Sequence, residues 1–443
     1  MRRNANPIIV RRRDGGPRKP APGAAGRLVR FVLLLAAAVF LFRSAEAEEN
    51  IERLLFSRGM LGPRELAVIV NEADPSSVAI GNYYQKRRGI PEENMIRVSF
   101  PPGSDNLPRV LFESVKRTAD QLTPPRVQAY ALAWMAPFRV DCMSITSAFA
   151  FGFDEAYCSS KCGETRPSGY FHSGSRAPYT DHGIRPAMML AGRTVQDVRN
   201  LIDRGIASDR TYPAGTGYLL NTSDKHRSVR AVTFDKTVDT LGAAIRLRRV
   251  EADFISDRRD VLFYFTGLAK VPDLDTLGFV PGAMADHLTS FGGRLTENAQ
   301  MSSVRWLEAG ATASYGTVAE PCNILSKFPH PAVAIWHYLE GDTVLEAYWK
   351  SVARPGEGVF IGEPLAAPFA PQLIEHEGRI TVRLFSPRSR MLALQAAASA
   401  VGPYRSAVRT YILIPGYNEL SFRLPDAAAF YRLAYLGGEK TKN

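Results

Sequence analysis

Apolar residues are distributed along the chain in a pattern that alternates between buried strands and amphipathic helices. The run ELAVIVN at residues 65–71 is almost continuously apolar and contains β-branched residues, which is typical of a strand buried on both faces. Asp74 and Pro75 then provide a helix start, and Gly89 followed by Pro91 provides a stop. The pattern continues with a predicted strand at 95–100, a helix at 110–121 and a strand at 127–135.

Strand and helix patterns alternate again after residue 193. We expect helices at 194–206, 238–250, 302–308 and 332–352, and strands at 217–221, 261–267, 311–318 and 358–365. This alternation predicts an α/β fold with a doubly wound, mostly parallel sheet and helices on both faces. Because ligands bind at the carboxyl ends of parallel strands, the loops after Met135, Gly267 and Val318 are the candidate binding loops.

Two stretches depart from this alternation and suggest the domain boundaries. Residues 140–193 are rich in Ser, Gly, Pro and aromatic residues, and we interpret them as a long insertion. Such a loop in a compact domain usually has a function or is cross-linked by disulfides. From residue 370, short alternating segments are separated by turn residues, which predicts a small antiparallel β-sandwich. The expected organisation is a leader at 1–47, an α/β domain at 48–369 and a sandwich at 370–443.

Positive charge is concentrated at the N-terminus. The formal net charge is +11, but residues 1–47 hold ten Lys and Arg against two acidic residues. The rest of the chain therefore has 45 basic and 42 acidic side chains, an ordinary balance for a globular domain. This balance removes the main support for nucleic-acid binding.

The basic start leads into twelve apolar residues at 31–42 and then to Ala45 and Ala47, small residues that a signal peptidase requires. We predict a secretory signal peptide cleaved near Glu48, and hence export to the periplasm or the exterior. The alternative is an uncleaved segment, which would be the chain's only membrane contact. The basic lead is long for a signal peptide, and translation from a start nearer Val29 would give a more ordinary one.

Four cysteines, Cys142, Cys158, Cys162 and Cys322, lie in the predicted mature chain. An even number in an exported protein favours disulfides over free thiols, and four cysteines permit three pairings. The close spacing of Cys158 and Cys162 favours a local loop, which would leave Cys142 for Cys322. A structural zinc site would need a second close cysteine pair or a His-x-x-x-His spacing, and the chain has neither.

Several stretches between residues 60 and 369 resemble, in order, those of a family of bacterial exported proteins of unknown function. They read NEADPSSVAIGNYYQKRRGIP, FYFTGLA, PGAMADHLTSFGG, ASYGTVAEPC, KFPHP, EAYWKSV and IGEPLAAPF. A more distant resemblance is to the gingipain-like cysteine peptidases of the caspase fold. In those peptidases one strand ends in His-Gly and the next ends in the nucleophilic Cys, and the order of the following elements is similar here. The resemblance implies a caspase-like sheet.

The residues of the peptidase dyad are absent from the matching positions. Thr266 and Gly267 stand where His-Gly would be, and Asp286 and His287 lie near the position of the expected Cys. Because the thiolate is the nucleophile and His is its base or acid, the loss of both removes that mechanism. Cys322 lies one element later, where a disulfide partner is favoured over a displaced nucleophile. The resemblance therefore implies a pseudo-peptidase with a binding or envelope-associated role.

The segment ADHLTS nevertheless contains the residue types of a nucleophilic site, and a hydrolase of serine or metal type is the alternative function. Its candidate catalytic residues are Asp286, His287, Ser290 and Thr266. Adjacent Asp and His side chains project in different directions, so Asp286 is not expected to orient His287. If these strand ends instead form a binding crevice, it would be lined by Thr266, Gly267, Asp286, His287, Ser314, Tyr315 and Gly316. As a polar loop residue, His287 should then contribute about 1 kcal/mol or less to stability.

The insertion supports two further hypotheses. Asp181 and His182 form a second Asp-His pair near His172, and these three are the metal-ligand candidates; no other cofactor is expected. Aromatic residues in the insertion could form a surface for a peptide, carbohydrate or envelope-protein partner, or they could pack the insertion onto the sheet. They are Phe149, Phe151, Phe153, Tyr157, Tyr170, Phe171 and Tyr179. Four arginines either meet an anion or pair with acidic residues: Arg185, Arg193, Arg227 and Arg230.

Overall fold

The structure is a computed structural model, and it describes residues 54–56, 61–159, 162–296, 299–404, 406–424 and 428–436. The predicted leader at 1–47 lies outside these residues, so its cleavage stays a prediction. Within the described ranges, none of the helices has the length and apolar character needed to cross a bilayer.

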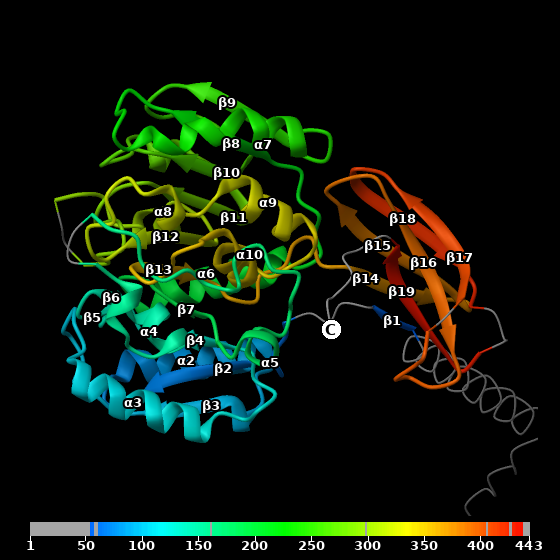
Figure 1. Ribbon diagram of the computed structural model, residues 1–443, viewed down its shortest axis with the longest axis horizontal. Coiled ribbons are helices and arrows are strands. Elements are labelled where there is room, and N and C mark those ends of the chain that lie inside the picture. The colour runs from blue at the N-terminus through cyan, green and yellow to red at the C-terminus, as the bar shows by residue number, and fades with distance from the viewer. Residues whose placement is uncertain are drawn as a thin grey trace, which may run out of the picture.

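A ten-stranded sheet forms the centre of the larger domain (Figure 1). Its strands lie in the order β3-β2-β4-β7-β13-β12-β11-β10-β8-β9. They are β2 (Leu66–Asn71), β3 (Met95–Val98), β4 (Ala129–Leu132), β7 (Ala187–Met189), β8 (Thr216–Asn221), β9 (Arg246–Glu251), β10 (Val261–Thr266), β11 (Phe279–His287), β12 (Ala313–Thr317) and β13 (Gly358–Gly362). Among the described strands of this sheet, β12 and β13 form the one antiparallel pair. The predicted α/β class with a mostly parallel sheet is confirmed.

The antiparallel pair divides the sheet into two halves that run in opposite directions. Strands β3, β2, β4, β7 and β13 are parallel to one another, as are β12, β11, β10, β8 and β9. The carboxyl end of β4 therefore lies at the opposite edge of the sheet from the carboxyl ends of β10 and β12. The three candidate binding loops after Met135, Gly267 and Val318 therefore do not lie at one edge of the sheet, because hydrophobic patterns carry no information about strand direction.

Helices cover both faces of the sheet. One face packs against α2 (Pro75–Arg88), α7 (Phe234–Leu241), α9 (Pro331–Leu339) and α10 (Val344–Ser351), and the other against α3 (Arg109–Leu122), α4 (Ile145–Phe151) and α8 (Val304–Glu308). Helix α6 (Val195–Ser208) contributes to the clusters on both faces, and the short α5 (Pro178–His182) lies in the insertion. The termini of α2 follow the sequence prediction: the Asp74 carboxylate accepts the Ser76 N–H at 2.9 Å, and Gly89 ends the helix with φ +66°.

Three predicted elements differ in the structure. The helix expected at 238–250 ends at Leu241, and residues 246–251 form the edge strand β9, whose charged side chains suit an exposed sheet edge. The helix expected at 332–352 is two helices, because Gly341 adopts φ +86° and Thr343 then caps α10. The predicted insertion contains the central strand β7, which is too short to show a periodic pattern.

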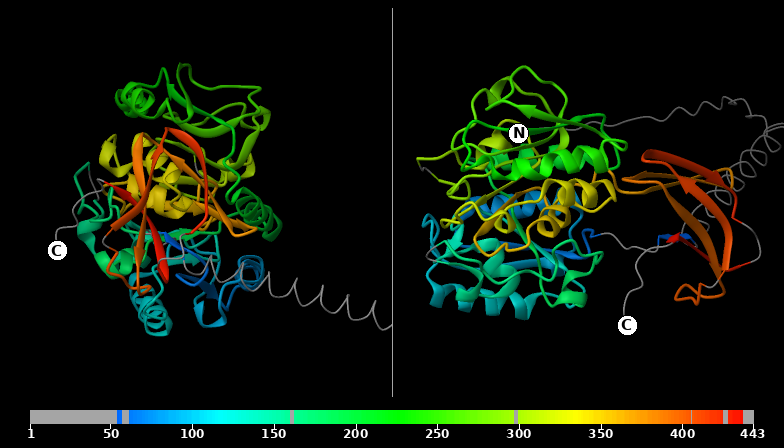
Figure 2. Two further views of the ribbon diagram at one scale, coloured as in Figure 1. Left: turned by 90° about the vertical axis from the view of Figure 1, so that its right-hand side faces the viewer. Right: turned by 45° about the horizontal axis from the view of Figure 1, so that its top comes forward.

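The C-terminal region forms two small antiparallel sheets, which confirms the predicted sandwich-like texture (Figure 2). One contains β14 (Gln372–His376), β15 (Arg379–Ser386) and β18 (Gly416–Phe422); the other contains β16 (Arg390–Ala397), β17 (Ser406–Leu413) and β19 (Phe430–Leu436). The N-terminal strand β1 (Leu54–Phe56) joins the second sheet by pairing in parallel with β19. The start of the described chain is thus tied to its end, a pairing that the sequence pattern does not indicate.

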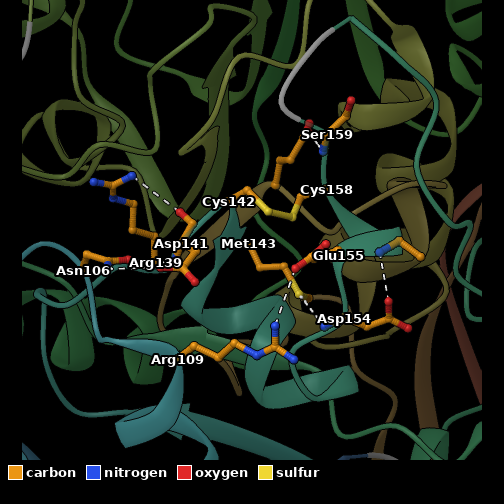
Figure 3. Close-up of a disulfide and its surroundings, with 12 residues drawn as sticks. Asn106, Arg109, Arg139, Asp141, Cys142, Met143, Asp154, Glu155, Cys158 and Ser159 are labelled. Carbon is orange, nitrogen blue, oxygen red and sulfur yellow. Dashed lines mark hydrogen bonds and ion pairs between the residues drawn. A yellow bond between two sulfur atoms is a disulfide. The ribbon is translucent and has the colours of Figure 1, made fainter.

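One disulfide lies within the insertion, and a second joins the insertion to the loop after β12. They join Cys142 to Cys158 and Cys162 to Cys322, with Cα–Cα distances of 5.7 and 5.5 Å. The predicted pairings of Cys158 with Cys162 and of Cys142 with Cys322 are wrong. Cys158 pairs with Cys142 inside the insertion, whereas Cys162 pairs with Cys322 in the loop after β12. Around the first bridge, the Asp141 N–H donates to Asn106 Oδ1 at 2.7 Å (Figure 3). Two disulfides are typical of proteins in an oxidising compartment.

Candidate functional site

The residues predicted to line a crevice do meet at the carboxyl ends of β10, β11 and β12. Thr266 pairs in register with His287, and Phe265 with Asp286. Asp286 and His287 point to opposite faces, as expected for neighbours in a strand. The two candidates consequently belong to different side-chain environments and do not form a catalytic pair.

Asp286 lies in a buried ion pair. Its Oδ1 is 2.6 Å from Arg230 Nη2, and both side chains are at most 3% exposed. The same Arg230 nitrogen donates to the Thr266 carbonyl at 2.7 Å. Burial raises the pKa of Asp286 to about 6, although the Arg230 charge opposes this shift. This carboxylate secures the segment that contains Arg230 to the strand ends.

His287 is a buried, neutral structural residue. The Trp306 indole Nε1–H donates to His287 Nδ1 at 2.9 Å, and His287 Nε2 donates to the Met301 carbonyl at 3.0 Å. This pair of contacts fixes the tautomer, because an indole can only donate and a carbonyl can only accept. Burial lowers the pKa of His287 to about 4. Neither ring nitrogen is therefore available as a general base.

Backbone segments close the expected crevice. A Cβ on Gly267 would lie 1.8 Å from the Arg227 carbonyl oxygen, and a Cβ on Gly316 would lie 2.3 Å from the backbone of Gly292 and Gly293. Glycine is required at these positions because main chain packs directly on main chain. The prediction of an accessible crevice is wrong: Thr266, Asp286, His287, Ser314 and Tyr315 are each at most 1% exposed. Ser290 is the partly exposed member of the catalytic candidates.

The three metal-ligand candidates have separate contacts. His182 Nε2 lies 3.0 Å from the Ser173 hydroxyl, and Asp181 Oδ2 accepts the Ser175 hydroxyl at 2.5 Å. His172 instead contacts His337. Across the part of the chain that the structure describes, no group of three or more His, Cys, Asp or Glu side chains has an arrangement that could hold a metal ion.

The aromatic residues and arginines noted in the sequence largely support the fold. Phe149 and Tyr170 are fully buried, whereas Phe171 and Tyr179 are 38% and 36% exposed. The Arg185 guanidinium covers the Tyr179 ring at 3.4 Å. The remaining arginines form ion pairs: Arg193 with Glu308, Arg227 with Asp224, and Arg230 with Asp286.

A different region offers space for a ligand. A cavity of about 680 Å³ lies between the α/β domain and the C-terminal sheets. Its walls come from the insertion, from α7 and α9 with the residues that precede them, and from β16 and β19. We call it the interdomain cavity; the lining residues used below are His172, Lys236, His330, Ala332, Val333, Trp336, His337, Glu340, Arg388, Arg390, Tyr435 and Leu436.

Two contacts between the domains form part of the cavity wall. Arg390 Nη1 donates to Glu340 Oε1 at 2.7 Å, and the Arg388 guanidinium lies 5.4 Å from the centroid of a Trp336 ring. Elsewhere in the interface, the Phe369 and Phe385 rings pack at 4.9 Å. Because both domains supply the walls, the position of the sandwich determines the shape of the cavity.

A line of hydrogen-bonded side chains leads from the protein interior to this cavity. Asp342 Oδ2 accepts from His337 Nδ1 at 3.0 Å, and His337 Nε2 lies 3.1 Å from His172 Nδ1. Asp342 also contacts Arg176 and Lys350, each at 2.6 Å. Although burial opposes it, the charges of Arg176 and Lys350 hold the pKa of Asp342 well below its usual value. An ionised Asp342 orients His337 by accepting its Nδ1–H.

No sequence pattern indicates this cavity. The sequence suggests His172 only as a metal-ligand candidate, and His330 appears only within the KFPHP stretch. The residues that form the walls lie between positions 172 and 436, in segments that no local spacing connects. Neither a protein-family model, nor a curated protein, nor a solved structure matches the chain.

Proposed function

We propose that the protein is an exported binding protein on a gingipain-like, caspase-like scaffold that lacks peptidase chemistry, and that its ligand occupies the interdomain cavity. The observation that carries this proposal is the cavity itself. Its volume of about 680 Å³ lies within the range of about 300–1,000 Å³ that is usual for small-molecule sites. It is also located at a domain interface, where such sites frequently occur.

The chemistry of the strand ends supports binding over hydrolysis. All four cysteines are in disulfides, so the chain offers no thiolate nucleophile. His287 uses both ring nitrogens in buried structural hydrogen bonds, and Asp286 pairs with Arg230. A hydrolase that uses Asp286 and His287 would have to break these contacts before a substrate could enter.

Export is the other part of the proposal. The basic and apolar leader followed by Ala45 and Ala47 supports it, and so do the two disulfides. An envelope-associated role follows if the mature protein stays in the periplasm.

A cavity-filling variant tests the proposed site. Ala332 lies in the cavity wall on α9, and Ala332→Trp places a large side chain in the space where the ligand would bind. Val110→Trp is the matched control, because Val110 is 81% exposed on the surface of α3. The purified protein and both variants are screened by thermal unfolding against a library of small organic acids, sugars and peptides.

We expect at least one compound class to raise the Tm of the parent and of Val110→Trp but not of Ala332→Trp. A ligand at one hundred times its Kd should add about 2.7 kcal/mol to the free energy of unfolding. Equal stabilisation of all three proteins would place the ligand elsewhere and contradict the proposal. So would labelling of the parent by a serine-directed activity probe that is lost in Ser290→Ala.

A further inference from the structure

Arg390 lines the interdomain cavity and has an unpaired edge on its guanidinium group. Its side chain is 9% exposed, and Nη1 is engaged by Glu340. Nε and Nη2 are buried and have no hydrogen-bond partner. These two nitrogens lie on the same edge of the guanidinium and donate in parallel, which is the geometry that binds a carboxylate or phosphate through two oxygens. The Tyr435 ring supports the flat guanidinium at 3.5 Å and holds that edge in place.

The cavity wall also carries a surplus of positive charge. Glu340 is the one carboxylate among the lining residues, and Arg390 neutralises it. Lys236 and Arg388 have no carboxylate within ion-pair distance among the described residues. His330 Nδ1 is buried without a hydrogen-bond partner. Burial lowers the pKa of His330, and the nearby charges of Arg230 and Lys236 add to this effect. An anion would satisfy this environment.

The remaining wall is apolar. Val333, Trp336 and Leu436 line the same cavity, with Trp336 presenting a partly exposed indole. A bare inorganic ion would leave this surface in contact with water, whereas an apolar body would cover it.

We propose that the interdomain cavity binds a small organic acid, with its oxyanion on the Nε–Nη2 edge of Arg390 and its apolar body against Val333, Trp336 and Leu436. This inference rests on the proposed function and names the class of ligand. A carboxylate and a phosphate monoester share the required chemistry, and the test separates them.

Calorimetric titration of the purified protein with four probes tests this inference. Octanoate and octyl phosphate carry the two oxyanions, octanamide is the neutral equivalent of octanoate, and inorganic phosphate lacks an apolar body. Arg390→Met removes the donor edge but keeps the apolar stem. Because Arg390→Met leaves Glu340 buried without its partner, Arg390→Met/Glu340→Gln is titrated as well. Arg383→Met is the matched control, since Arg383 pairs with Glu419 at 2.9 Å on the exposed surface of β15.

We expect octanoate, octyl phosphate or both to bind the parent and Arg383→Met at least about tenfold more tightly than octanamide or inorganic phosphate. That difference should disappear in both Arg390 variants. If octanamide binds as tightly as octanoate and Ala332→Trp blocks both, the proposed site stands and the anion inference fails. Anion binding that survives in both Arg390 variants also overturns the inference. If none of the four probes binds at millimolar concentration, the anion inference fails, and the thermal-unfolding screen with Ala332→Trp decides the proposed site separately.

Discussion

Replacement of His287 by Ala should strongly destabilise the protein. The sequence alone suggests a polar loop residue worth about 1 kcal/mol or less. In the structure the ring is 1% exposed and connects the Trp306 indole to the Met301 carbonyl. The truncation therefore removes two hydrogen bonds and leaves a void beside a fully buried tryptophan.

The magnitude follows from what the truncation leaves behind. A buried donor without a partner costs about 1–3 kcal/mol, and this applies to the Trp306 N–H, which has no route to water. Met301 is only partly buried, so losing the hydrogen bond to its carbonyl should cost less. Loss of the packed ring adds a cavity term of about 1–2 kcal/mol. We expect a decrease of about 3–4 kcal/mol in the free energy of unfolding.

Urea denaturation under oxidising conditions measures this decrease as a shift of the midpoint at constant slope. His287→Phe keeps most of the volume and isolates the hydrogen-bond contribution, which should be about 1–3 kcal/mol. His376→Ala is the control, because His376 is exposed on β14 and its loss should change stability by less than about 0.5 kcal/mol. A His287→Ala protein within 1 kcal/mol of the parent would refute the structural role of this residue.

The parent should gain stability relative to His287→Phe as the pH rises from about 4 to 6.5, because in that range the unfolded state binds a proton on His287 and the folded state does not. Denaturation at several pH values measures this difference. A difference that stays constant across the range would disprove the lowered pKa of His287. Peptide mapping of the unreduced protein should recover Cys142 with Cys158 and Cys162 with Cys322, and a Cys158–Cys162 peptide would contradict the structure. Cys162→Ser/Cys322→Ser should cost more stability than Cys142→Ser/Cys158→Ser, because the two bridges span sequence separations of 160 and 16. Chain entropy gives about 5 kcal/mol for the longer loop and about 3 kcal/mol for the shorter one. Gly316→Ala should destabilise the protein by more than about 2 kcal/mol, because the new Cβ would lie 2.3 Å from the Gly292 backbone. Gly174→Ala is the control, since a Cβ there meets open space and should leave stability unchanged. Equal urea denaturation midpoints for the two variants would argue against the closed crevice.

Local patterns in the sequence predict the elements of the fold well. The apolar run at 65–71 and the caps at Asp74 and Gly89 give β2 and α2 within a residue, because these signals act over a few neighbouring positions. The pattern at 332–352 is continuous in hydrophobicity, but the backbone of Gly341 and the Thr343 cap separate α9 from α10. Strand direction and the partner of Cys162 depend on contacts between distant segments, which periodicity does not encode.

In the candidate site, too, the sequence predicts what depends on neighbouring positions but not what depends on contacts between distant segments. The sequence correctly places Thr266, Asp286 and His287 together, since consecutive parallel strands bring their ends to one edge. It does not indicate that the glycines at 267, 292, 293 and 316 let main chain fill that edge. The interdomain cavity is formed by packing between two domains, so its arginine edge is visible only in the folded chain.

The most direct measurement is the position of a bound anion in crystals of the protein soaked with ω-bromooctanoate. Bromine scatters anomalously, so a single peak locates the apolar end and the adjoining density locates the carboxylate. We predict a peak in the interdomain cavity near Trp336, with the carboxylate on the Nε–Nη2 edge of Arg390. A peak beside Thr266 and His287, or an interdomain cavity without ligand density, would contradict the account.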